Sequence, residues 1–218
     1  MDNFTLFLIW IGILIFSIVI HEVSHGAVAN MFGDPTAKKL GRLTLNPLPH
    51  LDPIGSVIVP LLLLIPAIFG APAIVFGWAK PVPFNPLYLK YKRWGAAIVG
   101  MAGPASNLVL AVIFGLLLRF LPVAENPELL GMALVFMIIV YLNLLLAIFN
   151  LIPIPPLDGS KLLFSLFPQI SRQTRAFLER NGFILLLLFI FFGFQIVIPV
   201  ISFFFSLITG IHTDALFQ

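Results

Sequence analysis

Five long stretches without a charged residue constrain the fold of this chain more than any other feature. They are residues 3–20, 53–79, 94–118, 129–157 and 181–211. A helix needs about 20 apolar residues to cross the hydrocarbon core of a bilayer. Only 10% of the residues are charged, whereas a soluble domain has roughly 25%. We therefore expect an all-α polytopic membrane protein embedded in the lipid bilayer.

The few charges and the absence of cysteine limit which functions are possible. The net charge is only +3, and the basic residues cluster in loops. That distribution is typical of membrane topology and does not suggest a nucleic-acid partner. Because the chain has no cysteine, any metal must be held by histidine and carboxylate.

The first apolar stretch ends in the motif His21-Glu22-Val23-Ser24-His25. On a helix, His21 and His25 lie one turn apart on the same face, so both imidazoles can bind one zinc ion. Glu22 lies beside that face, where it can act as a base. This reading requires the first helix to continue through His25, and places the histidines inside the membrane.

A catalytic zinc site usually has three protein ligands and one open position. Asp158 is the best third ligand, because the prolines of the segment 153–156 hold it on a rigid, non-helical stretch beside apolar sequence. An Asp-Gly turn at a helix end is the plainer alternative. His50 is a second candidate for the third ligand or for substrate contact, although it could also be an ordinary loop histidine.

Two asparagines in apolar sequence, Asn107 and Asn150, could donate hydrogen bonds to the substrate or to its oxyanion. Equally, they could form interhelical amide bonds that hold the helices together.

Two segments after the first helix have less certain structures. Leu43 and Leu45 alternate with polar residues over 40–46, which predicts a short β segment whose edge could pair with an unwound substrate. Residues 54–76 are apolar but interrupted by proline and glycine. They predict a re-entrant hairpin, with a single tilted span as the alternative.

Three motifs in order resemble the site-2 proteases, which are intramembrane zinc metalloproteases. They are the histidine motif, Gly103-Pro104-Ala105-Ser106-Asn107, and Asn150-Leu151-Ile152-Pro153 leading to Leu157-Asp158-Gly159. The resemblance implies one Zn²⁺ per chain held by His21, His25 and Asp158, with Glu22 as the general base.

The resemblance covers residues about 5–165 and is nearest to the compact prokaryotic branch without a PDZ domain. It implies a three-helix core and single-spanning membrane proteins as substrates, and leaves the oligomeric state open. We expect one membrane-embedded protease domain over 1–218, with a C-terminal span at about 183–209. The rival functions are a transporter or ion pathway that uses Glu22 and Asp158, and an inactive membrane scaffold.

Charge also predicts the topology. Basic residues lie in the loops before and after 54–76 and in the loop after Asp158, whereas the loop with Glu125 and Glu128 is acidic. The positive-inside rule then places the active site near the cytoplasmic side of a prokaryotic cell membrane and the N-terminus outside.

Overall fold

The computed structural model describes residues 2–59, 61–62, 65, 77–123 and 125–211 of the chain. The regular structure of these residues is entirely helical, which confirms the expected all-α class. Four helices are long and apolar enough to cross a bilayer, namely Phe4–Met31, Gly95–Arg119, Pro127–Asn150 and Arg172–Thr209. In hydrocarbon a helix satisfies its own backbone groups, which explains why the apolar stretches fold this way. The chain is an integral membrane protein.

Helix α1 (Asn3–Met31) carries the histidine motif in its C-terminal half. The Asp2 carboxylate caps its first turn by accepting a hydrogen bond from the Thr5 N–H at 2.6 Å. At 1.5 Å per residue the helix is about 43 Å long, more than the roughly 30 Å of hydrocarbon. Just after helix α1, Gly33 has a positive φ of 101°. The short helix α2 (Thr36–Lys39) then follows.

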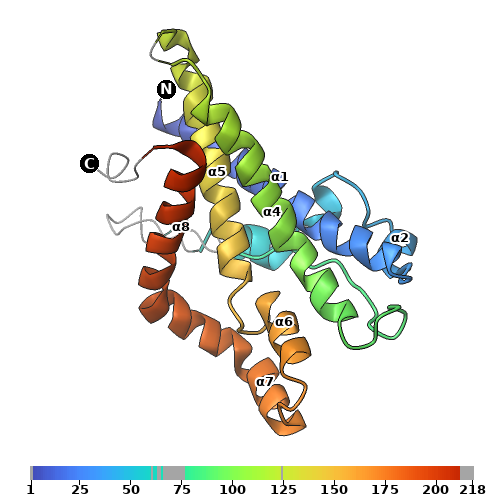
Figure 1. The fold of residues 1–218 in the computed structure, drawn as a ribbon. Coiled ribbons are helices and arrows are strands. Elements are labelled where there is room, and N and C mark those ends of the chain that lie inside the picture. The colour runs from blue at the N-terminus through green and yellow to red at the C-terminus, as the bar shows by residue number, and fades with distance from the viewer. Residues whose placement is uncertain (1, 60, 63–64, 66–76, 124, 212–218) are drawn as a thin grey trace.

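Helix α4 (Gly95–Arg119) packs against both α1 and α5 (Leu130–Asn150). The short connection between α4 and α5 makes these two helices antiparallel. Helix α1 is also antiparallel to α4, because His25 contacts Val99 whereas the earlier His21 contacts the later Asn107, so α1 and α5 run in the same direction (Figure 1). The C-terminal ends of α1 and α5 therefore lie at the same end of the bundle as the first half of α4. The apolar core where α4, α5 and the last helix meet contains Ala111, Val140, Leu144, Val197, Ile201 and Phe205.

The C-terminal part begins with helix α6 (Gly159–Leu166), which follows the irregular segment 151–158. Helix α7 (Arg172–Leu188) continues through a π-helical turn, η4 (Phe189–Gly193), into α8 (Phe194–Thr209). The chain changes direction between α7 and α8 (Figure 1), at the π-helical turn, a known cause of helix kinks. The expected span over 183–209 is thus the second half of a longer, bent helix.

The prediction of a short β segment over 40–46 is wrong, because these residues form turns and bends. Gly41 has a left-handed φ of 65°, and the Arg42 N–H donates to the Ala37 carbonyl at 2.9 Å. The Thr44 carbonyl is already bonded to the His50 imidazole at 3.0 Å. Alternation over four residues could not produce a strand without a neighbouring backbone to pair with.

The stretch 54–76, expected to form a re-entrant hairpin, is described only in part. It begins within a π-helical segment, η2 (Pro53–Ile58), whose first N–H groups are capped by the Asp52 carboxylate. Residues 60, 63–64 and 66–76 lie outside the described part, so the hairpin and the tilted span both stay predictions.

Candidate metal centre and active site

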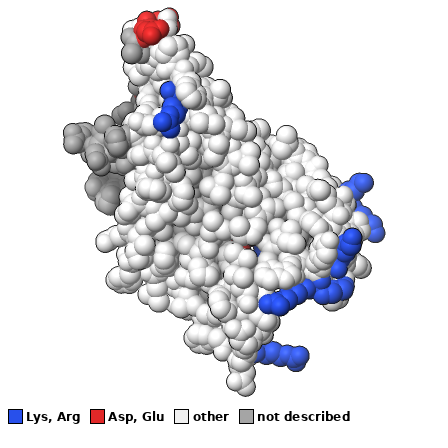
Figure 2. All heavy atoms as spheres, in the orientation of Figure 1, with Lys and Arg blue, Asp and Glu red and all other residues white. Residues whose placement is uncertain are grey.

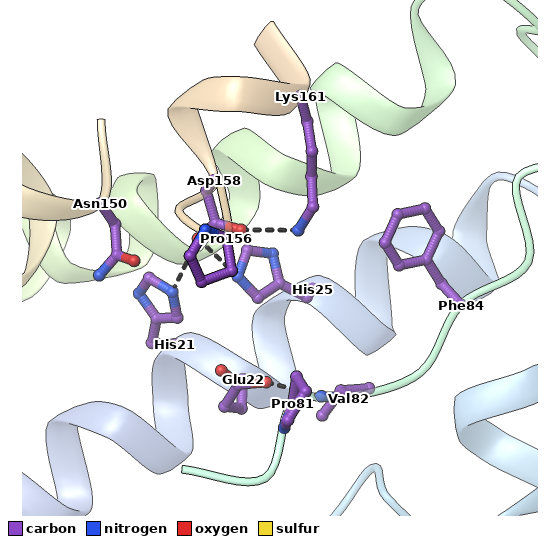
Figure 3. Close-up of a pocket in the computed structure, with 10 residues that line it drawn as sticks. All are labelled: His21, Glu22, His25, Pro81, Val82, Phe84, Asn150, Pro156, Asp158 and Lys161. Carbon is purple, nitrogen blue, oxygen red and sulfur yellow. Dashed lines mark hydrogen bonds and ion pairs between the residues drawn. The ribbon is translucent and has the colours of Figure 1, made fainter. Parts of the chain in front are cut away.

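Three side chains predicted as metal ligands meet at one point. His21 and His25 lie one turn apart on α1, with ring centroids 4.7 Å apart. The Asp158 Oδ2 atom lies 3.0 Å from His21 Nε2 and 3.1 Å from His25 Nε2 (Figure 3). All three side chains are buried. A donor set of two imidazole nitrogens and one carboxylate oxygen is one that zinc prefers.

The segment 151–158 holds Asp158 where α5 ends and α6 begins. The Leu157 N–H donates to the Ile154 carbonyl at 2.9 Å, and the Ser160 N–H donates to the Leu157 carbonyl at 3.1 Å. Gly159 permits this tight path, because a Cβ there would lie 2.2 Å from the Leu151 carbonyl oxygen. Asp158 is therefore fixed by local backbone packing and does not sit on a free loop.

The outer nitrogens of both imidazoles are hydrogen-bonded to α4. His25 Nδ1 lies 2.6 Å from the Val99 carbonyl oxygen, which can only accept. His21 Nδ1 lies 2.6 Å from the Asn107 Oδ1 atom. Both Nδ1 atoms must then carry the proton, which leaves the Nε2 lone pairs directed at the shared point. This tautomer is the one required for metal binding through Nε2, so the residues present fit a zinc ion.

Behind His21, a chain of buried polar groups links three helices. The Asn107 amide nitrogen donates to Asn143 Oδ1 at 2.7 Å, and the Asn143 amide nitrogen donates to the Ser17 hydroxyl at 3.0 Å. Asn107 therefore forms interhelical amide bonds, the second of the two roles considered for it. Its side chain is fully buried and does not line the pocket. Neither Asn143 nor Ser17 was predicted from the sequence. The signal that could have revealed Asn143 is its amide in an apolar span, which needs a partner such as Asn107.

Glu22 lies on the other side of the metal point, beside an extended segment. Its Oε2 atom accepts a hydrogen bond from the Val82 N–H at 2.7 Å. One carboxylate oxygen of Glu22 also lies within 4.8 Å of ring nitrogens of His21 and His25. Asp158 Oδ2 lies within 3.1 Å of both Nε2 atoms, whereas one Glu22 oxygen is bonded to the Val82 N–H, so Asp158 is the better placed of the two carboxylates for a third ligand.

The extended segment 77–86 runs past Glu22 and is tied to the protein at several points. The Lys80 N–H donates to the His50 carbonyl at 2.9 Å, and Arg42 donates to the Lys80 carbonyl at 2.7 Å. His50 is buried and serves this loop packing. Among the described residues it does not line the pocket, so the structure does not bring it to the metal point.

Asp34 anchors the far end of this segment. Its fully buried carboxylate accepts hydrogen bonds from the Asn85 N–H at 2.5 Å, the Thr36 N–H at 3.0 Å and the Thr36 hydroxyl. Burial opposes ionisation of this group, but the hydrogen bonds outweigh it and lower the pKa of Asp34 below its ordinary value.

A small pocket of about 110 Å³ opens beside the metal point. It is lined by His21, Glu22, His25, Pro81, Val82, Phe84, Asn150, Pro156, Asp158 and Lys161 (Figure 3). This volume exceeds the roughly 10–15 Å³ that one water molecule needs, so the pocket has room for several waters. Asn150 is thus in reach of a bound group, and its amide nitrogen also donates to the Leu146 carbonyl at 2.9 Å.

Comparison with known proteins identifies a family of proteases and relatives named as zinc metalloproteases. The sequence profile of peptidase family M50 matches residues 124–192, which include Asp158. The chain is 43% identical over 179 residues to a Bacillus subtilis protein named "Putative zinc metalloprotease YwhC", covering 80% of this chain and 76% of that protein. It is 33% identical over 174 residues to "Putative zinc metalloprotease Rip2" of Mycolicibacterium smegmatis, covering 78% of this chain and 60% of that protein. No solved structure gives a significant match.

Proposed function

This chain belongs to peptidase family M50, the site-2 protease family, and we propose that it hydrolyses peptide bonds in or near transmembrane segments of other membrane proteins. It is a membrane-integrated zinc metalloprotease. One observation carries the proposed activity. The Nε2 atoms of His21 and His25 converge on an Asp158 oxygen, and a second carboxylate, Glu22, lies beside them in the same pocket. A transporter or ion pathway that relays charge would need ionisable groups along a path across the membrane. Here the ionisable side chains of the pocket gather at one point.

In the proposed reaction, His21, His25 and Asp158 hold the zinc ion, and Glu22 moves the proton. When bound, zinc acts as a Lewis acid that lowers the pKa of water and polarises a carbonyl. Glu22 accepts a proton from the attacking water and later returns it to the amine that leaves. The Val82 N–H holds one oxygen of Glu22, so the other oxygen is available for this transfer. Asn150 lines the same pocket and is our candidate for a hydrogen-bond donor to the substrate carbonyl oxygen, a role that requires its amide to turn from the Leu146 carbonyl.

Substitution of Glu22 by glutamine tests this assignment of the base. Glu22→Gln keeps the size of the side chain but cannot accept the proton. We expect loss of cleavage of a model transmembrane peptide in vesicles, with one zinc per chain retained. Glu128→Gln, at the opposite end of the bundle, is the matched control and should cleave normally. Near wild-type cleavage by Glu22→Gln would refute the proposed role.

The substrate is proposed to be a single-spanning membrane protein that unwinds before cleavage. A peptide bond inside a helix is shielded by helical hydrogen bonds and must become extended to enter the pocket. The segment 77–86, and not 40–46, is the extended backbone beside Glu22 where such a chain could lie. Substrates with glycine or proline near the scissile bond should be cleaved faster than matched leucine runs. Equal rates would argue against unwinding as a requirement.

The active site is proposed to lie near the cytoplasmic side of a prokaryotic membrane. Lys and Arg gather at the end of the molecule where α1 and α5 finish, and acidic residues lie at the opposite tip (Figure 2). Arg119 is the exception; its guanidinium donates to the Leu207 carbonyl at 3.0 Å near the end of α8. The positive-inside rule supports placing the basic end in the cytoplasm.

A further inference from the structure

We propose that Lys161 is a positioning residue that makes Asp158 a one-oxygen ligand and so keeps a coordination position open. The inference rests on the proposed zinc site. It concerns a residue to which the resemblance and the comparisons assign no role.

The two oxygens of Asp158 have different partners. Oδ2 lies 3.0 and 3.1 Å from the two imidazole Nε2 atoms, whereas Oδ1 lies 2.7 Å from the Lys161 ammonium. The Asp158 side chain is only 7% exposed, so water has little access to either oxygen. The carboxylate is therefore divided between the metal point and one lysine.

The Lys161 side chain is held in place by three neighbours. Lys161 lies in the first turn of α6, three residues after Asp158. Its stem packs against Gly100 of α4, where a Cβ would lie 2.9 Å from the Lys161 Cδ atom. Its ammonium also lies 5.4 Å from the centre of the Phe84 ring, within cation–π range. An exposed surface lysine would not have this set of constraints, and Lys161 is only 30% exposed.

The division of oxygens matters because a carboxylate can bind a metal through one oxygen or through both. Two oxygens from Asp158 would fill a position that a catalytic zinc site must leave open for water or substrate. A charge-assisted hydrogen bond from Lys161 makes Oδ1 a poor second ligand. Among the described pocket residues, Lys161 is the only lysine or arginine, so no other cation lining the pocket could take over this bond.

The test compares Lys161→Met, which keeps the stem but removes charge and donor, with Lys161→Arg, which retains both. Lys39→Met, at an exposed position on α2, is the matched control. Zinc-edge X-ray absorption on the purified proteins reports the number of oxygen and nitrogen neighbours. Zinc content and the separate kcat and KM for a model transmembrane peptide complete the measurement.

We expect Lys161→Met to gain one oxygen neighbour at zinc and to lose roughly ten-fold or more in kcat, with KM little changed. Lys161→Arg and Lys39→Met should resemble the wild type. An unchanged absorption spectrum and kcat in Lys161→Met would overturn the inference alone. Equal loss of zinc from Lys161→Met and Lys161→Arg would also overturn it, because the role would then be packing. Wild-type protein without zinc would overturn the proposed function as well.

Discussion

Replacing Gly103 by alanine should damage the metal site through a single methyl group. A Cβ on Gly103 would lie 2.5 Å from the Nε2 atoms of both His21 and His25. To reach an ordinary separation of 3.4 Å, these atoms must move apart by about 0.9 Å. Ligand distances in a metal site tolerate only about 0.2 Å. Overpacking of this kind costs about 1–3 kcal/mol, which corresponds to roughly 5- to 150-fold weaker zinc binding.

The assay is competition for zinc between the detergent-purified protein and a chromophoric chelator. Gly12→Ala is the matched control, because a Cβ on Gly12 in α1 would meet no atom within 4 Å. Alanine is the better helix former by roughly 0.5–1 kcal/mol, so this control should keep its zinc and be slightly more stable. Wild-type zinc affinity in Gly103→Ala would refute the reasoning, since the imidazoles could not then occupy the positions described.

Three further predictions follow from other parts of the structure. Asn143→Leu removes a link in the polar chain behind the histidine site and should weaken zinc binding about 10- to 100-fold; unchanged affinity would contradict this. The pKa of Asp34 is lowered on folding, so its hydrogen bonds stabilise the protein above the unfolded pKa of about 3.9 and lose effect as pH falls through the folded pKa. The Tm deficit of Asp34→Asn at pH 7 should therefore shrink near pH 3, and a constant deficit would disagree. Single cysteines replacing Lys39 and Lys90 should both be labelled only from the cytoplasmic face; labelling from opposite faces would mean that 54–76 crosses the membrane.

The spanning helices could be predicted from sequence because the bilayer imposes a simple physical requirement. The apolar stretch 94–118 matches α4 (Gly95–Arg119), and the apolar stretch 129–157 contains α5 (Leu130–Asn150). The ends of both helices are marked in the sequence by charged residues, by proline or by irregular sequence. The C-terminal span was harder, because α7 begins in polar, basic sequence at Arg172 and becomes apolar only in its second half.

The grouping of His21, His25 and Asp158 could also be predicted, since helical spacing fixes two residues and the shared direction of α1 and α5 brings the third to them. Their roles as ligands stay a prediction. The hydrogen bonds behind them could not be foreseen, because the partnership of Asn107 with Asn143 depends on how two helices are rotated against each other. The same limit applies to Lys161, whose bond to Asp158 depends on where α6 begins.

We propose that His21, His25 and Asp158 hold one zinc ion and that Glu22 is not a ligand. Zinc content per chain, measured by mass spectrometry on purified wild-type, Asp158→Ala and Glu22→Gln proteins, tests it most directly. We predict one zinc in the wild type and in Glu22→Gln, and loss of zinc from Asp158→Ala. Retention of zinc by Asp158→Ala together with its loss from Glu22→Gln would mean that Glu22, and not Asp158, is the third ligand.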